Sequence, residues 1–143
     1  MAAMENGFPG ATALPWRFAF DVVEMQPRQR LSLARLAVTP FLMRHACGAP
    51  PFALRIEAGG KVLCSSGDTE WVDELIEAAR DVDLLIGESY FLDKKVKFPL
   101  DFKTLAVRLA EIGAPRVILT HMSADMLGAS RRPVARPPET AWL

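Results

Sequence analysis

The stretch VLCSSGDT, residues 62–69, decides how this chain folds, because an apolar run ends there in a small turn that carries an aspartate. On its N-terminal side, residues 52–65 form two alternating apolar and polar runs around a Gly-Gly pair, which predicts a β-hairpin. On its C-terminal side, residues 70–80 place apolar residues at helical spacing, and Asp68 or Thr69 is expected to cap that helix. The segment therefore joins a β-meander to an α/β region.

Two more strands are expected upstream of the hairpin. Residues 17–25 mix aromatic and β-branched side chains, and residues 31–43 alternate apolar and polar positions. Pro40 interrupts the second run, so that strand either bends at Pro40 or lies on a sheet edge there.

Downstream of the turn, strands and helices alternate. Continuous apolar runs at 82–87 and 116–120 predict buried strands. Between them, Asp101 is expected to begin a helix that Gly113 ends, and residues 124–127 are expected to form one helical turn. This order predicts a layered α/β (α+β) fold.

Length and composition limit the organisation of the chain. Its 143 residues suffice for one domain, expected over 16–128, with a flexible segment at 1–15 and a disordered Arg/Pro-rich tail at 129–143. The formal net charge of zero gives no electrostatic argument for a nucleic-acid or membrane partner.

The cysteines and the apolar runs bear on the cell compartment. Cys47 and Cys64 show no metal-binding spacing and are expected to be reduced thiols. No apolar run approaches the roughly 18 residues of a membrane helix, and no signal peptide is recognisable. We therefore predict a cytoplasmic protein without a membrane partner.

Three residues with metal-binding side chains follow three predicted strands. Asp68, Glu88 and His121 each lie past the end of an apolar run, and ligands gather at the carboxyl ends of strands in α/β sheets. Aspartate and histidine suit zinc, manganese or iron. The sequence therefore predicts that the three side chains point at one sheet edge.

Each of these residues also has a structural interpretation that the sequence leaves open. Asp68 fits the cap of a helix, Glu88 a strand-end carboxylate facing water, and His121 a loop histidine bonded to backbone. His45, alone in a Pro-rich loop, fits a structural or solvent-facing role.

Three segments together resemble the metallo-β-lactamase-fold hydrolases. The SGDT turn within 62–69, the strand end LLIGE at 84–88 and the segment RVILTHMS at 116–123 occur in that family's order. The resemblance extends from Leu31 to Leu127 and is strongest to the branch of ribonuclease Z and related phosphodiesterases. It implies an αββα sandwich of which this chain is the C-terminal half, a mixed sheet with helices on one face.

The resemblance implies roles for individual residues. Asp68 matches the carboxylate that bridges two metal ions, zinc or alternatively manganese, and His121 matches the last histidine ligand. Glu88 matches an acidic residue that supports a catalytic histidine from behind the ligands. The setting of His45 resembles a loop on the substrate side.

The sequence lacks part of the family's metal-binding pattern, which predicts that the chain has no activity by itself. His45 and His121 are the only histidines in the sequence, so the family's HxHxDH signature is absent. We therefore expect a truncated chain that is inactive and retains no metal in isolation. Its partners would be a complementary N-terminal half or a second copy, and its substrate, if it is active, a phosphate ester.

The sequence leaves two alternatives to a metal-dependent hydrolase. One is a non-catalytic remnant or a partner-binding module that uses an unpaired sheet face. The other, a nucleotide-binding domain, is disfavoured because the sequence has neither GxGxxG nor GxxxxGK[ST].

Overall fold

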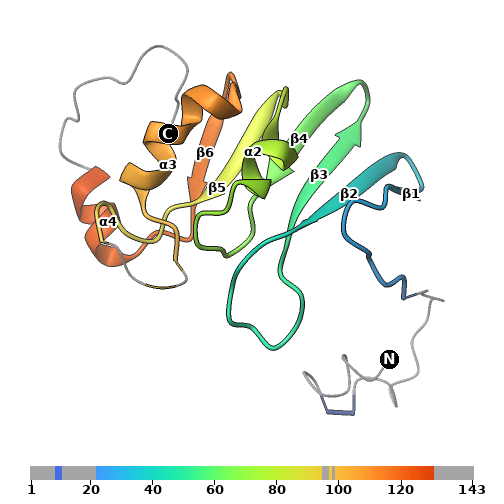
Figure 1. The fold of residues 1–143 in the computed structure, drawn as a ribbon, viewed down its shortest axis with the longest axis horizontal. Coiled ribbons are helices and arrows are strands. Elements are labelled where there is room, and N and C mark those ends of the chain that lie inside the picture. Colours follow the sequence, from blue (N-terminus) through green and yellow to red (C-terminus); the bar gives the residue numbers. More distant parts are fainter. Residues whose placement is uncertain (1–8, 11–21, 95–96, 98, 131–143) are drawn as a thin grey trace.

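One six-stranded sheet organises the part of the chain that the structure describes, residues 9–10, 22–94, 97 and 99–130 (Figure 1). This computed structural model contains the strands β1 (Leu31–Leu33), β2 (Leu36–Leu42), β3 (Phe52–Ala58), β4 (Lys61–Ser65), β5 (Leu84–Glu88) and β6 (Val117–Thr120). Its helices are α2 (Glu74–Ala79), α3 (Phe102–Ile112) and α4 (Ala124–Ser130). The strands lie in the sheet in the same order as in the chain.

The sheet is mixed, and its strand directions bring several strand ends to one edge. The pairs β1–β2, β2–β3 and β3–β4 are antiparallel, whereas β4–β5 and β5–β6 are parallel. The carboxyl ends of β4, β5 and β6 therefore lie next to one another. Every residue that follows one of these three strands reaches the same edge of the sheet.

Helices α2 and α3 cover one face of the sheet, which we call the covered face. Strand alternation points Phe41, Cys64, Leu85 and Val117 toward these helices, where they join one buried cluster. The helices contribute Leu75, Ala78, Ala79, Leu105 and Ile112 to the same cluster. The predicted arrangement, a mixed sheet with helices on one face, is confirmed.

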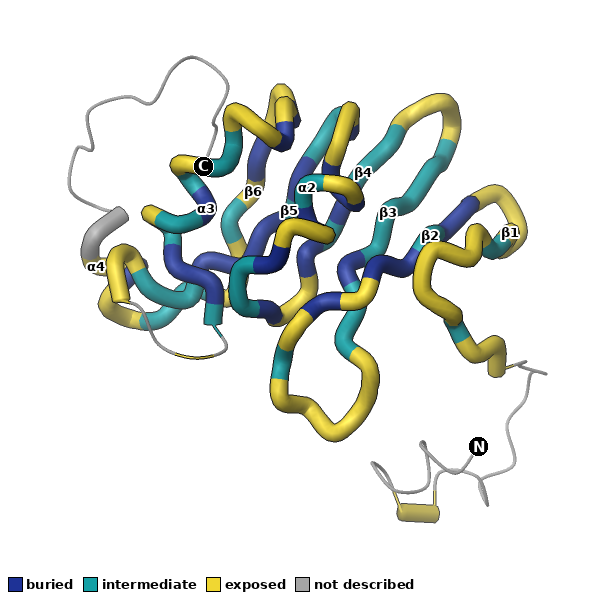
Figure 2. The backbone as a smooth tube through the Cα atoms, viewed as in Figure 1, coloured by how far each residue is buried: buried dark blue, intermediate teal, exposed yellow. Residues whose placement is uncertain are grey.

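The opposite face of the sheet, which we call the open face, carries several exposed apolar residues, and Figure 2 marks exposed and buried positions along the strands. Register pairs Leu33 with Leu36 and Ile86 with Ile118 on this face. The exposed members are Leu33, Leu36, Leu42 and Ile118. An apolar sheet face of this kind is typical of a surface that binds another structural layer.

Several predicted elements agree closely with the structure. The hairpin over 52–65 is observed as β3 and β4, joined through Gly59 and Gly60. Helix α3 begins after Asp101, whose side chain accepts a hydrogen bond from the Thr104 amide, and ends at Gly113 with φ of 71°. Strands are also observed at the two apolar runs, shifted by one or two residues at their ends. The prediction that both are buried is correct for β5 but wrong for β6, which lies at the end of the sheet with only Val117 buried.

The strand predicted over 31–43 was wrong as a single element. It is a hairpin of β1 and β2, in which Leu33 pairs with Leu36 across a turn at Ala34 and Arg35. Ala34 adopts a left-handed φ of 53°, which a turn this tight requires and which no glycine signals in the sequence. Pro40 lies beyond the last residue of β2 that pairs with β1, and its carbonyl oxygen accepts a hydrogen bond from the Arg28 amide over 2.7 Å.

The helix predicted over 70–80 was too long, and its predicted cap was wrong. Helix α2 begins only at Glu74, after Asp73. The preceding backbone is bound elsewhere, since the Glu70 amide donates to the Arg44 carbonyl oxygen over 3.0 Å. Tertiary hydrogen bonds therefore replace the first helical turn.

The ends of the chain test the remaining predictions only in part. Val22–Met25 form no strand, so the strand predicted over 17–25 was wrong there, and residues 17–21 lie outside the described residues. Helix α4 extends to Ser130, which corrects the tail predicted to be disordered from residue 129; residues 131–143 lie outside the described part. Of the segment 1–15, only Pro9 and Gly10 are described, and they form a turn. No helix among the described residues has the length and apolar character needed to cross a membrane.

Candidate metal centre

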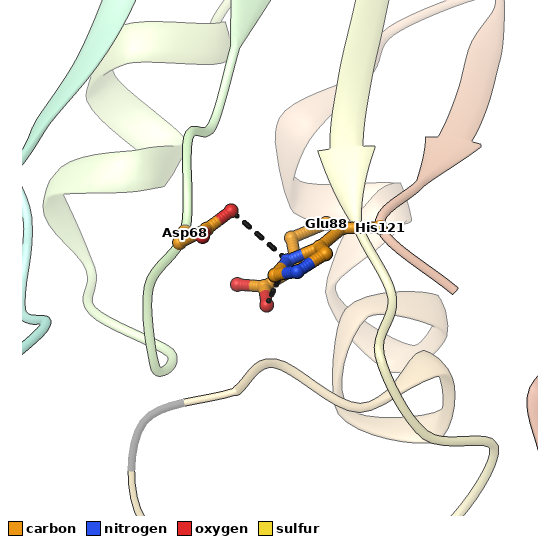
Figure 3. Close-up of side chains that lie close together, drawn as sticks. All are labelled: Asp68, Glu88 and His121. Atoms are coloured by element: carbon orange, nitrogen blue, oxygen red, sulfur yellow. Dashed lines mark hydrogen bonds and ion pairs between the residues drawn. The ribbon is translucent and has the colours of Figure 1, made fainter. Parts of the chain in front are cut away.

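Asp68, Glu88 and His121 come together where three neighbouring strands end (Figure 3). Glu88 is the last residue of β5, His121 directly follows β6, and Asp68 lies three residues beyond β4. The Nδ1 atom of His121 lies 3.0 Å from Oδ1 of Asp68 and 3.1 Å from Oε1 of Glu88. The structure thus brings the three predicted site residues to one edge of the sheet.

Backbone geometry places the two outer members of the group. Gly67 has a φ of 60°, and a Cβ atom at this position would lie 2.9 Å from the carbonyl oxygen of Phe52. Only glycine fits this close approach, so the turn that presents Asp68 depends on it. His121 itself adopts a left-handed φ of 56°, a conformation that is uncommon for a residue with a side chain and is found at functional sites.

Glu88 differs from its two partners in burial. Its side chain is 1% exposed, whereas those of Asp68 and His121 are 50% and 47% exposed. Burial raises the pKa of Glu88 above its usual value, and the nearby charge of Asp68 acts in the same direction. The hydrogen bond from the Thr69 amide and the proximity of His121 oppose that rise in the pKa.

The group fits a metal ion chemically. Each of the three residues offers one ligand atom, and these atoms all lie within 4.8 Å of one another. Carboxylate oxygen and imidazole nitrogen are the ligands that zinc and manganese take in proteins. Because Asp68 and His121 are half exposed, an ion could reach them from solvent. The site therefore has the donor set of a metal centre.

Two further residues, His45 and Tyr90, differ in their relation to the group of Asp68, Glu88 and His121. His45, which the sequence analysis placed in a substrate-side loop, is half-buried and does not belong to the three-residue group. Tyr90 was not predicted, although its ring forms a T-shaped contact with that of His121 at a centroid distance of 5.2 Å. Its position two residues after Glu88, where β5 ends, was the only sequence signal that could have indicated it.

Comparison with known proteins places the chain in a family. Residues 1–122 match the beta-lactamase superfamily domain. The chain belongs to the beta-lactamase superfamily. Its sequence relatives include ribonucleases Z, as the sequence motifs indicated, and its structural neighbours have the metallo-β-lactamase fold.

One relative and two solved structures illustrate the similarity. The ribonuclease Z of Myxococcus xanthus is 39% identical over 95 residues, which cover 58% of this chain and 31% of that protein. The metallo-β-lactamase fold protein YhfI from Bacillus subtilis has a TM-score of 0.69 at 19% identity, over 89% of this chain and 55% of YhfI. A diphosphatase from the PhnP family has a TM-score of 0.65 at 15% identity, over 98% of this chain and 50% of that one.

These superfamily members are longer than the chain. It spans about a third of the ribonuclease Z relative and about half of the two solved structures. The fold similarity therefore covers part of the superfamily fold.

Proposed function

We propose that the chain contributes to a metal-dependent hydrolase of phosphodiester or related ester bonds. The observation that carries this proposal is the convergence of Asp68, Glu88 and His121 at the carboxyl ends of neighbouring strands. The names of its relatives support the substrate class, since one is a ribonuclease and another a diphosphatase, and both names denote cleavage of phosphate linkages.

In this proposal Asp68 and His121 hold the metal ion, with zinc expected and manganese as the alternative. When bound, such an ion polarises a phosphoryl oxygen and lowers the pKa of a coordinated water. Two other residues have assigned roles in this proposal. Glu88 supports the two ligands from behind, and His45 lies in a loop on the substrate side. The unpaired Cys47 and Cys64 fit a reducing cytoplasm.

We propose further that the chain is not sufficient for activity. A catalytic zinc ion takes three protein ligands, and with the buried Glu88 assigned to a place behind them, Asp68 and His121 provide only two. The missing ligands would come from a complementary N-terminal half whose sheet packs on the open face. Its exposed residues Leu33, Leu36 and Ile118 would then be buried between two sheets.

A metal titration with an activity assay tests this function. The purified chain is expected to bind zinc weakly, to carry substoichiometric zinc after dialysis, and not to hydrolyse an aryl phosphodiester. Asp68→Asn and His121→Gln should each remove the weak zinc binding, whereas His45→Gln should leave it unchanged. Zinc binding that survives both ligand substitutions would disprove the metal site. Turnover by the chain alone would disprove the need for a second half.

The open face also supports a second candidate, a non-catalytic module that binds a partner or a second copy through the sheet. The specific observation is the set of exposed apolar residues on a sheet face without a layer over it in the described residues. Analytical ultracentrifugation separates the two candidates. Self-association that Ile118→Asp removes, together with no zinc binding at all, would favour the module over the hydrolase.

A further inference from the structure

We infer that Glu88 is a positioning residue that joins the two metal ligands, with one carboxylate oxygen on each. This inference rests on the proposed metal site and adds a role that differs from the predicted one, the support of a histidine elsewhere in the family fold. Oε2 of Glu88 accepts a hydrogen bond from the Thr69 amide over 2.7 Å, next to Asp68. Oε1 lies 3.1 Å from Nδ1 of His121.

Burial separates this role from that of a ligand. Glu88 is 1% exposed, and it lies on the protein side of the group, while Asp68 and His121 are about half exposed. A hydrolytic ion needs an open coordination position that substrate or water can reach. The two exposed residues face such a position, and the buried carboxylate supports them from behind.

The bonds of Glu88 fix the loop that presents Asp68 at two points. Besides the contact to Thr69, the Glu88 amide donates to Oγ of Ser66 over 2.8 Å. The Ser66 amide in turn donates to the Ile86 carbonyl oxygen over 2.9 Å. The residues on both sides of the Gly67-Asp68 pair are therefore held to the end of β5, so Asp68 has little freedom to move away.

The contact of Oε1 of Glu88 determines which nitrogen of His121 is free to bind a metal ion. An ionised carboxylate only accepts hydrogen bonds, so Nδ1 of His121 must carry the proton that lies between them. The lone pair of the neutral ring then resides on Nε2, the atom left to bind a metal. The other contact of Nδ1, with Asp68, is available only while that carboxylate is not turned toward an ion.

Substitution by an amide tests this arrangement sharply. In Glu88→Gln, the side-chain oxygen must stay with the Thr69 amide, so the NH2 group faces Nδ1 of His121. An NH2 group donates, and it therefore favours the opposite tautomer, with the proton on Nε2 and no lone pair there for zinc. Asp68→Asn is the matched control, because it makes the same chemical change in the other neighbour of Nδ1. Its half-exposed side chain can rotate into water, so its NH2 group need not face Nδ1.

The tautomer is read by two-bond 1H–15N correlation NMR of the metal-free proteins. The chain has two histidines, so a His45→Gln spectrum assigns the signals of His121. We expect the Nδ1–H tautomer in the wild type and in Asp68→Asn, and the Nε2–H tautomer in Glu88→Gln. Added zinc should shift Nε2 in the wild type, with an affinity about tenfold or more lower in Glu88→Gln.

Three results would overturn the inference: a wild-type Nε2–H tautomer, an unchanged tautomer in Glu88→Gln, or zinc bound through Nδ1, which would make Glu88 a ligand. If Glu88→Gln fails to fold, Asp68→Asn still decides, because loss of its Nδ1–H tautomer would show that Glu88 alone does not set the ring. Absence of zinc binding in the wild type would instead disprove the proposed function, and the tautomers of the metal-free proteins would still test Glu88.

Discussion

The two faces of the sheet differ in what covers them. The covered face holds the buried core that stabilises the chain, whereas the candidate site lies at the rim of the open face. On the covered face, Leu85 and Leu105 are completely buried between sheet and helices. On the open face, Leu36 and Ile118 keep more than two fifths of their surface exposed. Glu88 points to the open-face side of β5, because a Cβ atom at the neighbouring Gly87 would point to the covered face and lie 3.1 Å from the Leu105 side chain of α3. The candidate site thus lies at the rim of the face that the described residues leave uncovered.

Thiol labelling should show the largest contrast between the faces. Burial raises the pKa of Cys64, on the covered face, to about 12. Its thiolate fraction at pH 8 is then roughly a thousandfold below that of an ordinary thiol, and reagent access is also blocked. A cysteine placed on the open face by Ile118→Cys should react at an ordinary rate. The comparison is made in a Cys47→Ser background, since Cys47 is exposed.

Stopped-flow or quench measurements with a disulfide reagent give the two rates directly. Unfolding in urea should make both thiols react equally fast, which serves as the control. Comparable rates in the native protein would mean that the helices do not shield the covered face.

Truncation of core residues should give the next largest contrast. Leu85→Ala on the covered face removes a fully buried side chain and is expected to lower the free energy of unfolding by about 3 kcal/mol. Ile118→Ala on the open face should cost about 1 kcal/mol or less, because the side chain is already 47% exposed.

Urea denaturation followed by circular dichroism measures both values. An equal loss in the free energy of unfolding in Ile118→Ala and Leu85→Ala would contradict the expected difference between the two faces. That result would indicate that the open face is buried in solution, as it would be in a dimer.

Removal of the cap of α3 should give the smallest effect. The Asp101 side chain accepts hydrogen bonds from the amide and the hydroxyl of Thr104, over 2.9 and 2.6 Å. Asp101→Ala should therefore lower the free energy of unfolding by about 1 kcal/mol. The matched control is Asp93→Ala, which removes only an exposed ion pair with Lys103 and should cost much less.

Both variants are compared by urea denaturation under the same conditions. Equal losses in the two variants would show that the cap does not hold α3 on the sheet. The covered face would then depend on side-chain packing alone.

The sequence predicted the elements whose signals are local. The Gly-Gly hairpin, the capped helix between Asp101 and Gly113, and the apolar runs of β5 and β6 follow from turn chemistry, capping and burial patterns. It failed where a tertiary bond overrides a local preference. The turn at Ala34 adopts a left-handed conformation without glycine, and the backbone at Glu70 bonds to Arg44 in place of starting a helix.

The same division holds for the candidate site. Spacing alone placed Asp68, Glu88 and His121 after three strands, because the carboxyl ends of adjacent parallel strands share one edge. The roles of their atoms could not be predicted. That Glu88 is buried and contacts both Thr69 and His121 depends on packing distances that no local pattern encodes.

The sequence by itself determined the family, the alternation of strands and helices, and the three residues at the site, because motifs and periodicity are properties of neighbouring positions. Only the tertiary structure decided which sheet face is covered and which carboxylate is buried behind the histidine. Those features arise when segments distant in the chain pack together, so their energies depend on contacts that form only in the folded molecule.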